Sequence, residues 1–159
     1  MKRINFLFKL YRKGKIEEVE PSEEIKKAYL IRADESLSSA KTLLQIGNLR
    51  DSVALAYYAM YHSVIGLLFR IGIKCENHAA AIIMLKEIFS IDNAQISKAK
   101  TDRVDKQYYV DFDVSREEAN SSIALAEEFR ANTVDFIEKL NEDKIKEYRK
   151  KALALIMGK

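Results

Sequence analysis

Apolar residues recur along much of this sequence at alternating spacings of three and four, which is the period of one face of an α-helix. The clearest run consists of Leu30, Ala33, Leu37, Ala40 and Leu44. A second run, towards the end of the chain, consists of Ile123, Ala126, Phe129, Thr133, Phe136 and Leu140. A β-strand would instead alternate with a period of two. The spacing therefore predicts long helices, each of which buries one face.

Composition supports the same fold class. The chain has 159 residues, the usual size of one domain, and with 48% hydrophobic and 32% charged residues it is globular rather than disordered. Five Gly and one Pro are too few for a fold that depends on many hairpin turns. We predict an all-α, antiparallel up-and-down bundle of four to five core helices, with short extra helices at both termini.

Capping residues predict where the helices begin. Ser22, Asn77 and Asp92 each precede a helical stretch, and Ser115-Arg116-Glu117-Glu118 has the form of a capping box. Glycines at 14, 47 and 72 predict helix ends. The expected helices cover about 1–13, 22–47, 51–71, 77–89, 92–109, 115–140 and 142–159, and no strand is expected. We divide the chain into a basic amphipathic arm (1–20), a helical bundle (21–141) and a C-terminal helical extension (142–159).

The segment Val53–Phe69 is the most apolar in the chain. It contains three Tyr, a His and a Ser, and it is short for a membrane span, so we interpret it as a buried core helix. Cys75 is the single cysteine, which excludes an intrachain disulfide. The apolar stretch Ile4–Leu10 is too short for a secretory signal and is interrupted by Lys9. We expect a cytoplasmic protein without membrane contact.

Positive charge is concentrated at the two ends. Residues 1–20 and residues 142–159 each carry six bases and three acids, whereas residues 21–141 carry 15 bases and 18 acids. The simpler interpretation is two solvated helix faces. The alternative is that the termini contact phosphate or an acidic partner.

Tyrosine and histidine gather within the apolar helix. Tyr58 and His62 are four residues apart and share a face, and Tyr57 and Tyr61 form the adjacent row. Such side chains could hold a base or a ribose. Aromatic residues on a central helix more commonly form the core, which we favour for most of these rings. Tyr61 and His62 are kept as candidate pocket residues.

A second segment, Arg103–Asp113, is dense in charge and aromatic residues where the helical period weakens. Arg103 has the donors to bind a phosphate or carboxylate in a bidentate manner. Acids at positions 105, 111 and 113 could hold a divalent cation, but their spacing is not that of a calcium loop. A connection whose acids cap neighbouring helices is an equally good interpretation. We expect this segment to pack beside the tyrosine-bearing helix.

Cys75 and His78 are three residues apart. One Cys and two His in the whole chain cannot supply the four ligands of a structural zinc site. A Cys–His nucleophile pair would lack a specified orienting group. We interpret His78 as a residue at a helix start beside an unreactive cysteine, and we expect no catalytic residue, metal or cofactor.

Two stretches resemble the HEPN domain superfamily, and within it the UPF0332-like prokaryotic proteins. The first is Ala54-Leu55-Ala56-Tyr57-Tyr58-Ala59-Met60-Tyr61-His62, followed by Gly72-Ile73-Lys74 and Asn77-His78. The second is Asp105-Lys106-Gln107-Tyr108-Tyr109-Val110-Asp111-Phe112, followed by Val114-Ser115-Arg116-Glu117-Glu118-Ala119. The resemblance covers about residues 22–140. It implies a dimerising helical bundle that is commonly paired with a minimal nucleotidyltransferase in a toxin–antitoxin module.

Active members of that family are metal-independent ribonucleases with an Arg, four to six residues and then a His. This chain departs from the pattern. Positions 55–57 before His62 and 71–73 before His78 hold no Arg, and Arg70 is separated from His78 by seven residues. The nuclease residues are therefore not carried over.

The leading hypothesis is a non-catalytic HEPN homodimer that binds a minimal nucleotidyltransferase, a nucleotide, or both, with RNA as a further ligand. Two alternatives remain: an RNA-cleaving toxin with a variant Arg70/His78 or Arg103/His78 pair, and a structural dimerisation module. The expected cleft for partner or ligand consists of Tyr57, Tyr61, His62, His78, Arg103, Tyr108, Tyr109 and Asp111.

Overall fold

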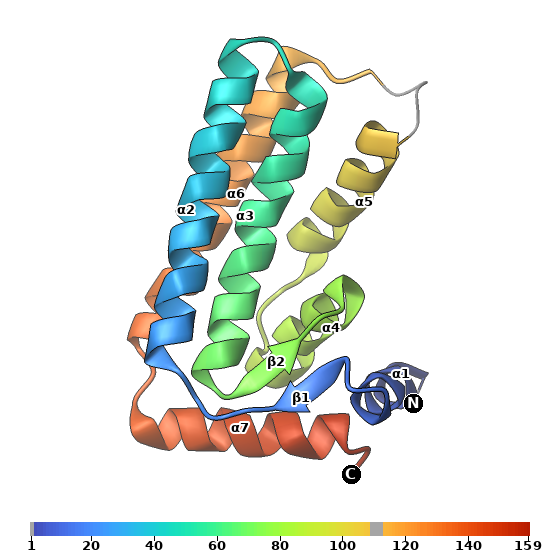
Figure 1. The fold of residues 1–159 in the computed structure, drawn as a ribbon, viewed down its shortest axis with the longest axis vertical. Helices are drawn as coiled ribbons and strands as arrows, with labels where there is room; N and C mark the ends of the chain where they lie inside the picture. Colours follow the sequence, from blue (N-terminus) through green and yellow to red (C-terminus); the bar gives the residue numbers. More distant parts are fainter. Residues whose placement is uncertain (1, 109–112) are drawn as a thin grey trace. The chain divides into compact units, whose positions relative to one another are not determined.

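The computed structural model describes the backbone of residues 2–108 and 113–159, and the side chains of these residues except 105–108. The described chain is all-α apart from one small sheet, as the spacing of apolar residues predicts (Figure 1). The elements in chain order are α1 Lys2–Arg12, β1 Ile16–Glu18, α2 Glu23–Gln45, α3 Leu49–Arg70, β2 Ile73–Cys75, α4 His78–Phe89, α5 Ala94–Tyr108, α6 Arg116–Glu138 and α7 Glu142–Ile156.

Three helix starts, those of α2, α4 and α6, are set by the predicted caps. The Ser22 hydroxyl accepts from the Ile25 N–H at 3.0 Å, and the Asn77 side chain accepts from the Ala80 N–H at 2.9 Å. The Ser115 hydroxyl accepts from the Glu118 N–H at 3.0 Å. Each bond satisfies a backbone donor that the first helical turn leaves without a partner. Helix α5 begins at Ala94, two residues after Asp92.

The chain divides into two compact units, and α2, α3 and α6 contribute residues to both. The first unit comprises residues 1–28, 64–93 and 136–159. In it α1 packs against α4 and α7, and α4 packs against α7. Leu7, Met84 and Ile156 are fully buried. Phe89, Phe136 and Tyr148 form an aromatic cluster with ring centroids 5.1 to 5.9 Å apart.

The first unit also contains a small sheet that the spacing of apolar residues does not predict. β1 pairs with β2 as a two-stranded antiparallel sheet in which Ile16 lies opposite Cys75 and Glu18 opposite Ile73. Ile16 and Ile73 are fully buried. The prediction that the chain has no strand is therefore wrong: strands of three residues are too short for their alternation to be recognised.

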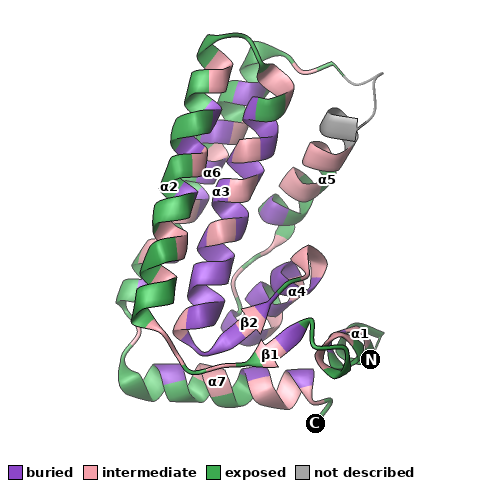
Figure 2. Cartoon of the chain, viewed as in Figure 1, coloured by how far each residue is buried: buried purple, intermediate pink, exposed green. Residues whose placement is uncertain are grey.

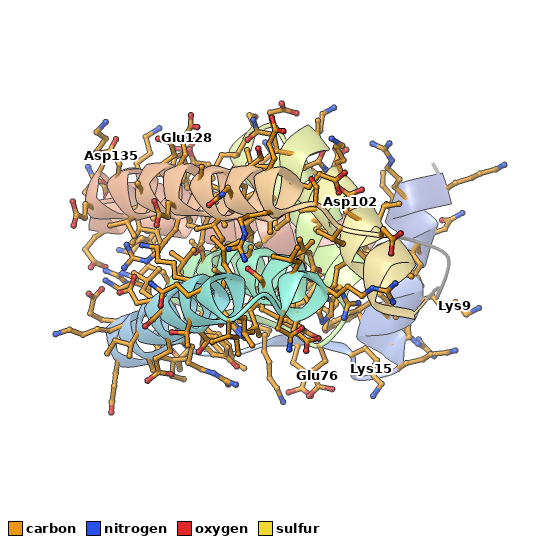
Figure 3. The ribbon with its side chains drawn as sticks, turned by 90° about the horizontal axis from the view of Figure 1, so that it is seen from above. Lys9, Lys15, Glu76, Asp102, Glu128 and Asp135 are labelled. Carbon is orange, nitrogen blue, oxygen red and sulfur yellow. The ribbon has the colours of Figure 1, made fainter. Side chains whose placement is uncertain are left out.

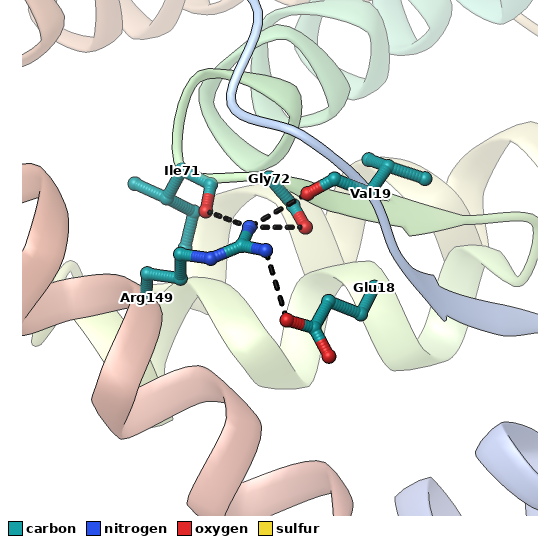
Figure 4. A network of polar contacts seen from close by, with 5 residues as sticks. All are labelled: Glu18, Val19, Ile71, Gly72 and Arg149. Atoms are coloured by element: carbon teal, nitrogen blue, oxygen red, sulfur yellow. Dashed lines mark hydrogen bonds and ion pairs between the residues drawn. The ribbon is translucent and has the colours of Figure 1, made fainter.

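Arg149 of α7 binds the chain segments that flank this sheet (Figure 4). Its Nη1 donates to the carbonyl oxygens of Val19 at 2.7 Å, Gly72 at 3.0 Å and Ile71 at 3.1 Å. Its Nη2 donates to a carboxylate oxygen of Glu18 at 2.9 Å. The C-terminal helix is thereby fixed to the ends of β1 and α3.

The second unit comprises residues 29–63 and 94–135. Parts of α2, α3 and α6 lie side by side in it (Figure 1). Polar contacts join these helices. The Ser52 hydroxyl donates to the Ala40 carbonyl at 2.8 Å, and Arg130 holds both carboxylate oxygens of Asp34 at 2.7 and 2.9 Å. Ala33, Leu37, Ala40, Met60, Ala119, Ile123, Ala126 and Phe129 form its apolar core.

Helix α3 is buried along most of its length (Figure 2). By length and composition alone it is the one helix in the described residues that could cross a membrane. Most of its apolar residues are instead buried inside the protein, which is typical of a core helix in a soluble protein. This confirms the prediction of a buried core helix for Val53–Phe69.

Candidate functional site: an arginine on a tyrosine cluster beside a cavity

The tyrosines of α3 form two stacked pairs in the second unit. The rings of Tyr57 and Tyr61 stack with centroids 6.2 Å apart, and those of Tyr58 and His62 stack at 6.0 Å. Residues four apart on a helix lie one above the other, so the sequence alone dictates these pairs. Tyr29 of α2 extends the cluster, with its ring centroid 5.9 Å from that of His62.

Arg103 of α5 closes this cluster from the other side. Its Nη1 donates to the Tyr58 hydroxyl at 3.0 Å. Its guanidinium carbon lies 5.3 Å from the Tyr57 ring centroid and 5.4 Å from that of Tyr58, within the range of a cation–π interaction. The expected proximity of the two segments is therefore confirmed for Arg103, which joins α5 to α3.

Tyr57 is buried at the centre of this arrangement, with 1% of its surface exposed. Burial raises the pKa of Tyr57 well above its ordinary value, and the nearby charge of Arg103 only partly opposes the effect. Tyr57 therefore remains a neutral phenol at physiological pH. It offers a ring and a hydroxyl for binding rather than a base for proton transfer.

A cavity of about 530 Å³ lies between α3, α5 and α6 in the same unit. This volume is in the range of small-molecule sites, which span ~300–1,000 Å³. Its lining combines an apolar part with polar side chains. The apolar residues are Val53, Ala56, Tyr57, Met60, Ala99 and Leu125; the polar ones are Gln95, Lys98, Asp102, Ser115, Glu117, Glu118, Ser121 and Ser122. Because Tyr57 belongs to both features, the cavity and the Arg103 cluster form one candidate site.

The structure brings together four of the predicted cleft residues. Tyr57, Tyr61, His62 and Arg103 belong to one cluster in the second unit, and of these Tyr57 lines the cavity. His78 begins α4 and is described with the first unit. Tyr109 and Asp111 lie outside the described residues, and Tyr108 outside the described side chains.

Most polar residues of the cavity were not identified from the sequence. Lys98 and Asp102 lie on α5, whose apolar period is weak, and Glu117 was assigned only to helix capping. The pair Ser121-Ser122 could have indicated the cavity, because these two small hydroxyl side chains precede the buried Ile123 in an amphipathic helix. Small polar residues beside a core position leave space at a helix surface.

Cys75 is not arranged for nucleophilic chemistry. Burial raises the pKa of the Cys75 thiol to about 11, and the thiol donates to the Asn77 carbonyl with a sulfur–oxygen distance of 3.3 Å. The reactive thiolate is therefore scarce at neutral pH, which supports the interpretation of Cys75 as a packing residue. Within the described residues no group of three or more His, Cys, Asp or Glu side chains could hold a metal ion.

Comparison with known proteins defines the class. The HEPN domain family model matches residues 26–139, which is most of the chain. The chain therefore belongs to the HEPN domain family, as the two sequence stretches predict. The matched region excludes α1, β1 and α7.

Two relatives are informative. A UPF0332 protein of Pyrococcus horikoshii is 45% identical over 62 residues, which are 39% of this chain and 43% of that protein. A protein of Methanocaldococcus jannaschii with the name "Putative toxin" is 35% identical over 104 residues, 61% of this chain and 77% of that protein. The chain thus matches less than half of the first relative's length.

Proposed function

We propose that this protein is a non-catalytic HEPN component of a toxin–antitoxin-like module in the cytoplasm, where it binds a minimal nucleotidyltransferase partner, a nucleotide, or both, as a homodimer. The observation that carries the proposal is the position of Arg103, held by Tyr57 and Tyr58 beside a cavity of ligand size. The relative with the name "Putative toxin" supports the module.

The geometry of the arginines favours binding over cleavage. Within the unit Arg103 donates to the Tyr58 phenol and lies over two tyrosine rings. Arg70, the nearest arginine before His78 in sequence, has Nε 2.9 Å from a Glu23 oxygen and an Nη nitrogen 3.9 Å from a Glu142 oxygen. An arginine that stabilises a transition state must instead direct its donors at the reacting phosphate.

The cavity is suited to an uncharged or weakly charged part of a nucleotide. The Tyr57 and Met60 side chains provide an apolar surface, and Ser121 and Ser122 supply hydroxyls. Three carboxylates and only one lysine line the cavity, so a triphosphate would be repelled from its interior. A bound nucleotide would place its base or ribose inside.

Thermal unfolding with added nucleotide tests the proposal that the cavity binds a nucleotide. ATP at 100 times its Kd should stabilise the protein by about 2.7 kcal/mol. Ser122→Phe, which fills the cavity, should abolish the shift, whereas Ala124→Phe on the exposed face of α6 should retain it. An equal shift in both variants would place the ligand elsewhere.

Co-expression with a minimal nucleotidyltransferase encoded next to the gene tests the proposal that this protein binds such a partner. Co-elution in size-exclusion chromatography supports the proposal, and separate elution of the two proteins counts against it. The mass of the eluted complex also reports whether this chain is dimeric.

A second candidate function is RNA cleavage without a metal. One contact favours it: Arg103 and His62 both lie against Tyr58, so an arginine and a histidine flank the same phenol. Incubation with RNA separates the two functions. Cleavage that is lost in His62→Ala and in Arg103→Ala, but retained in His78→Ala, would establish the nuclease and reject the non-catalytic proposal.

A further inference from the structure

The two units carry opposite charge. The first unit contains 18 Lys and Arg against 12 Asp and Glu, a formal net charge of +6, whereas the second contains 9 against 12, a net charge of −3. The fold produces this separation because it brings both basic ends of the chain into one unit, where α1 packs against α7. The first unit is therefore the basic part of an almost neutral protein.

Helix α1 and Lys13, the residue that follows it, present to solvent a stripe of cations without carboxylate partners among the described residues. At 100° per residue, Lys2, Lys9, Arg12 and Lys13 fall within an arc of about 100° on the side opposite the buried Leu7. All four are exposed, and within the described residues none has a carboxylate partner. Figure 3 shows Lys9 pointing away from α1. We refer to these four residues as the α1 stripe.

Two basic residues beside the α1 stripe, Arg3 and Lys15, form ion pairs with acidic side chains. Arg3 of α1 lies 3.5 Å from Glu87 of α4. Lys15 lies 3.7 Å from Glu76 (Figure 3). Acids thus neutralise the bases beside the α1 stripe but not the stripe itself. Unpaired, ordered cations on a helix surface are suited to a polyanion.

Further cations lie next to the stripe. Lys2 lines a hollow with Arg3 and Glu87, and Glu87 also lines a second hollow with Lys86 and Lys151. The two hollows therefore adjoin, which extends the basic surface from α1 to α4 and α7. Neither Lys86 nor Lys151 has an ion-pair partner among the described residues.

An aromatic ring stands at the edge of the stripe. Phe8 is 39% exposed, one residue before Lys9 and one turn before Arg12. An exposed ring among lysines and arginines is the arrangement on which bases of a single strand stack while their phosphates contact the cations. We infer that the α1 stripe, with Phe8, is a binding surface for single-stranded nucleic acid that lies outside the matched HEPN region.

The apolar side of α1 argues against a membrane as the occupant. A helix that binds a bilayer inserts its apolar face among acyl chains. In α1 Leu7 is fully buried and the helix packs against α4 and α7, whereas Ile4 and Phe8 are 38% and 39% exposed. The apolar surface left on α1 therefore consists of two partly covered side chains, which is a small area to insert among acyl chains.

The test is fluorescence anisotropy with a labelled 20-nucleotide single-stranded RNA between 50 and 200 mM salt. Each lost phosphate contact on a single strand lowers the slope of log K against log salt by about 0.7. The triple variant Lys9→Gln, Arg12→Gln, Lys13→Gln should therefore reduce the slope by about 2 and weaken binding about tenfold or more. The control triple Lys27→Gln, Lys100→Gln, Lys146→Gln removes the same charge outside the cavity and should change affinity less than about twofold.

Phe8→Leu separates stacking from charge, because it keeps an apolar side chain and removes the ring. This substitution should weaken the binding of single-stranded RNA about tenfold without changing the slope of log K against log salt. Circular dichroism of each variant verifies that the helices are retained.

Three results would overturn the inference. The first is an equal loss of binding in the control triple, which would mean that net charge alone is responsible. The second is wild-type affinity in Phe8→Leu. The third is a polyglutamate peptide of equal charge that competes as well as the RNA, since the surface would then select an acidic protein. None of these variants alters the Arg103 cluster or its cavity, so the outcome is independent of the proposed function.

Discussion

Arg149 occupies the space that a side chain at Gly72 would need. A Cβ at position 72 would lie 1.7 Å from Nη1 of Arg149 and 2.5 Å from the Val19 carbonyl oxygen. Gly72 also has a φ of +84°, in the left-handed region. The absence of a side chain at one residue thus allows a guanidinium from α7 to reach three carbonyl oxygens.

Gly72→Ala should be among the most destabilising substitutions in the chain. It combines a strained backbone with displacement of Arg149, and we expect a loss of about 2–4 kcal/mol in the free energy of unfolding. Urea denaturation measures this loss. Gly14→Ala is the matched control, since Gly14 has a φ of +69° but no atom within 4 Å of the added Cβ. A comparable loss in both would show that only backbone strain matters.

Arg149→Met should cost about 1–3 kcal/mol because it leaves carbonyl oxygens without their donor at a partly buried position. Glu18→Gln should cost less than about 1 kcal/mol, since the Glu18 side chain is 42% exposed and the ion pair is screened by solvent. Chemical denaturation of both variants gives the comparison. If Glu18→Gln were the more damaging change, the ion pair rather than the carbonyl contacts would hold α7 in place.

Cys75 should make the protein less stable in alkali. Its thiol pKa is raised from 9.0 to about 11 in the folded state, so the neutral thiol stabilises the fold fully below pH 9, and this contribution is lost between about pH 9 and 11 as the unfolded thiol ionises first. From pH 8 to pH 10 the wild type should lose about 1 kcal/mol relative to Cys75→Ala. Parallel pH profiles for the two proteins would contradict the raised pKa.

The contact between Tyr58 and Arg103 can be measured with a double-mutant cycle. Tyr58→Phe removes the acceptor of the hydrogen bond and keeps the ring, whereas Arg103→Met removes both the donor and the charge. We expect a coupling energy of about 1 kcal/mol in the free energy of unfolding. Additive effects of the two substitutions would indicate that Arg103 is held by its stacking on the rings alone.

The fold was predictable because its signals are local. The three-and-four spacing fixes the buried faces of α2 and α6, and side chains such as Ser22 and Ser115 set where those helices begin. The sheet, in contrast, pairs residues that are far apart in the sequence. It joins Ile16 to Cys75 across the whole of α2 and α3, and three residues in each strand leave no recognisable pattern.

The candidate site was predictable only in part. The stacking of Tyr57 on Tyr61 follows from helical geometry, and the charge density around Arg103 indicated a functional segment. The cavity depends instead on how α5 and α6 pack against α3, which brings Lys98 and Ser121 to the same space although 22 positions separate them in sequence. No spacing rule for a single helix contains that information.

The sheet also has a consequence for the order in which the chain folds during synthesis. β1 leaves the ribosome early, but its pairing strand follows some sixty residues later, and the guanidinium that binds both segments belongs to α7. Until Arg149 has been translated, the carbonyl oxygens of Val19, Ile71 and Gly72 lack the guanidinium that donates to them in the folded protein. A stalled or shortened nascent chain would therefore expose this N-terminal segment to chaperones and proteases, however well its central helices had already assembled.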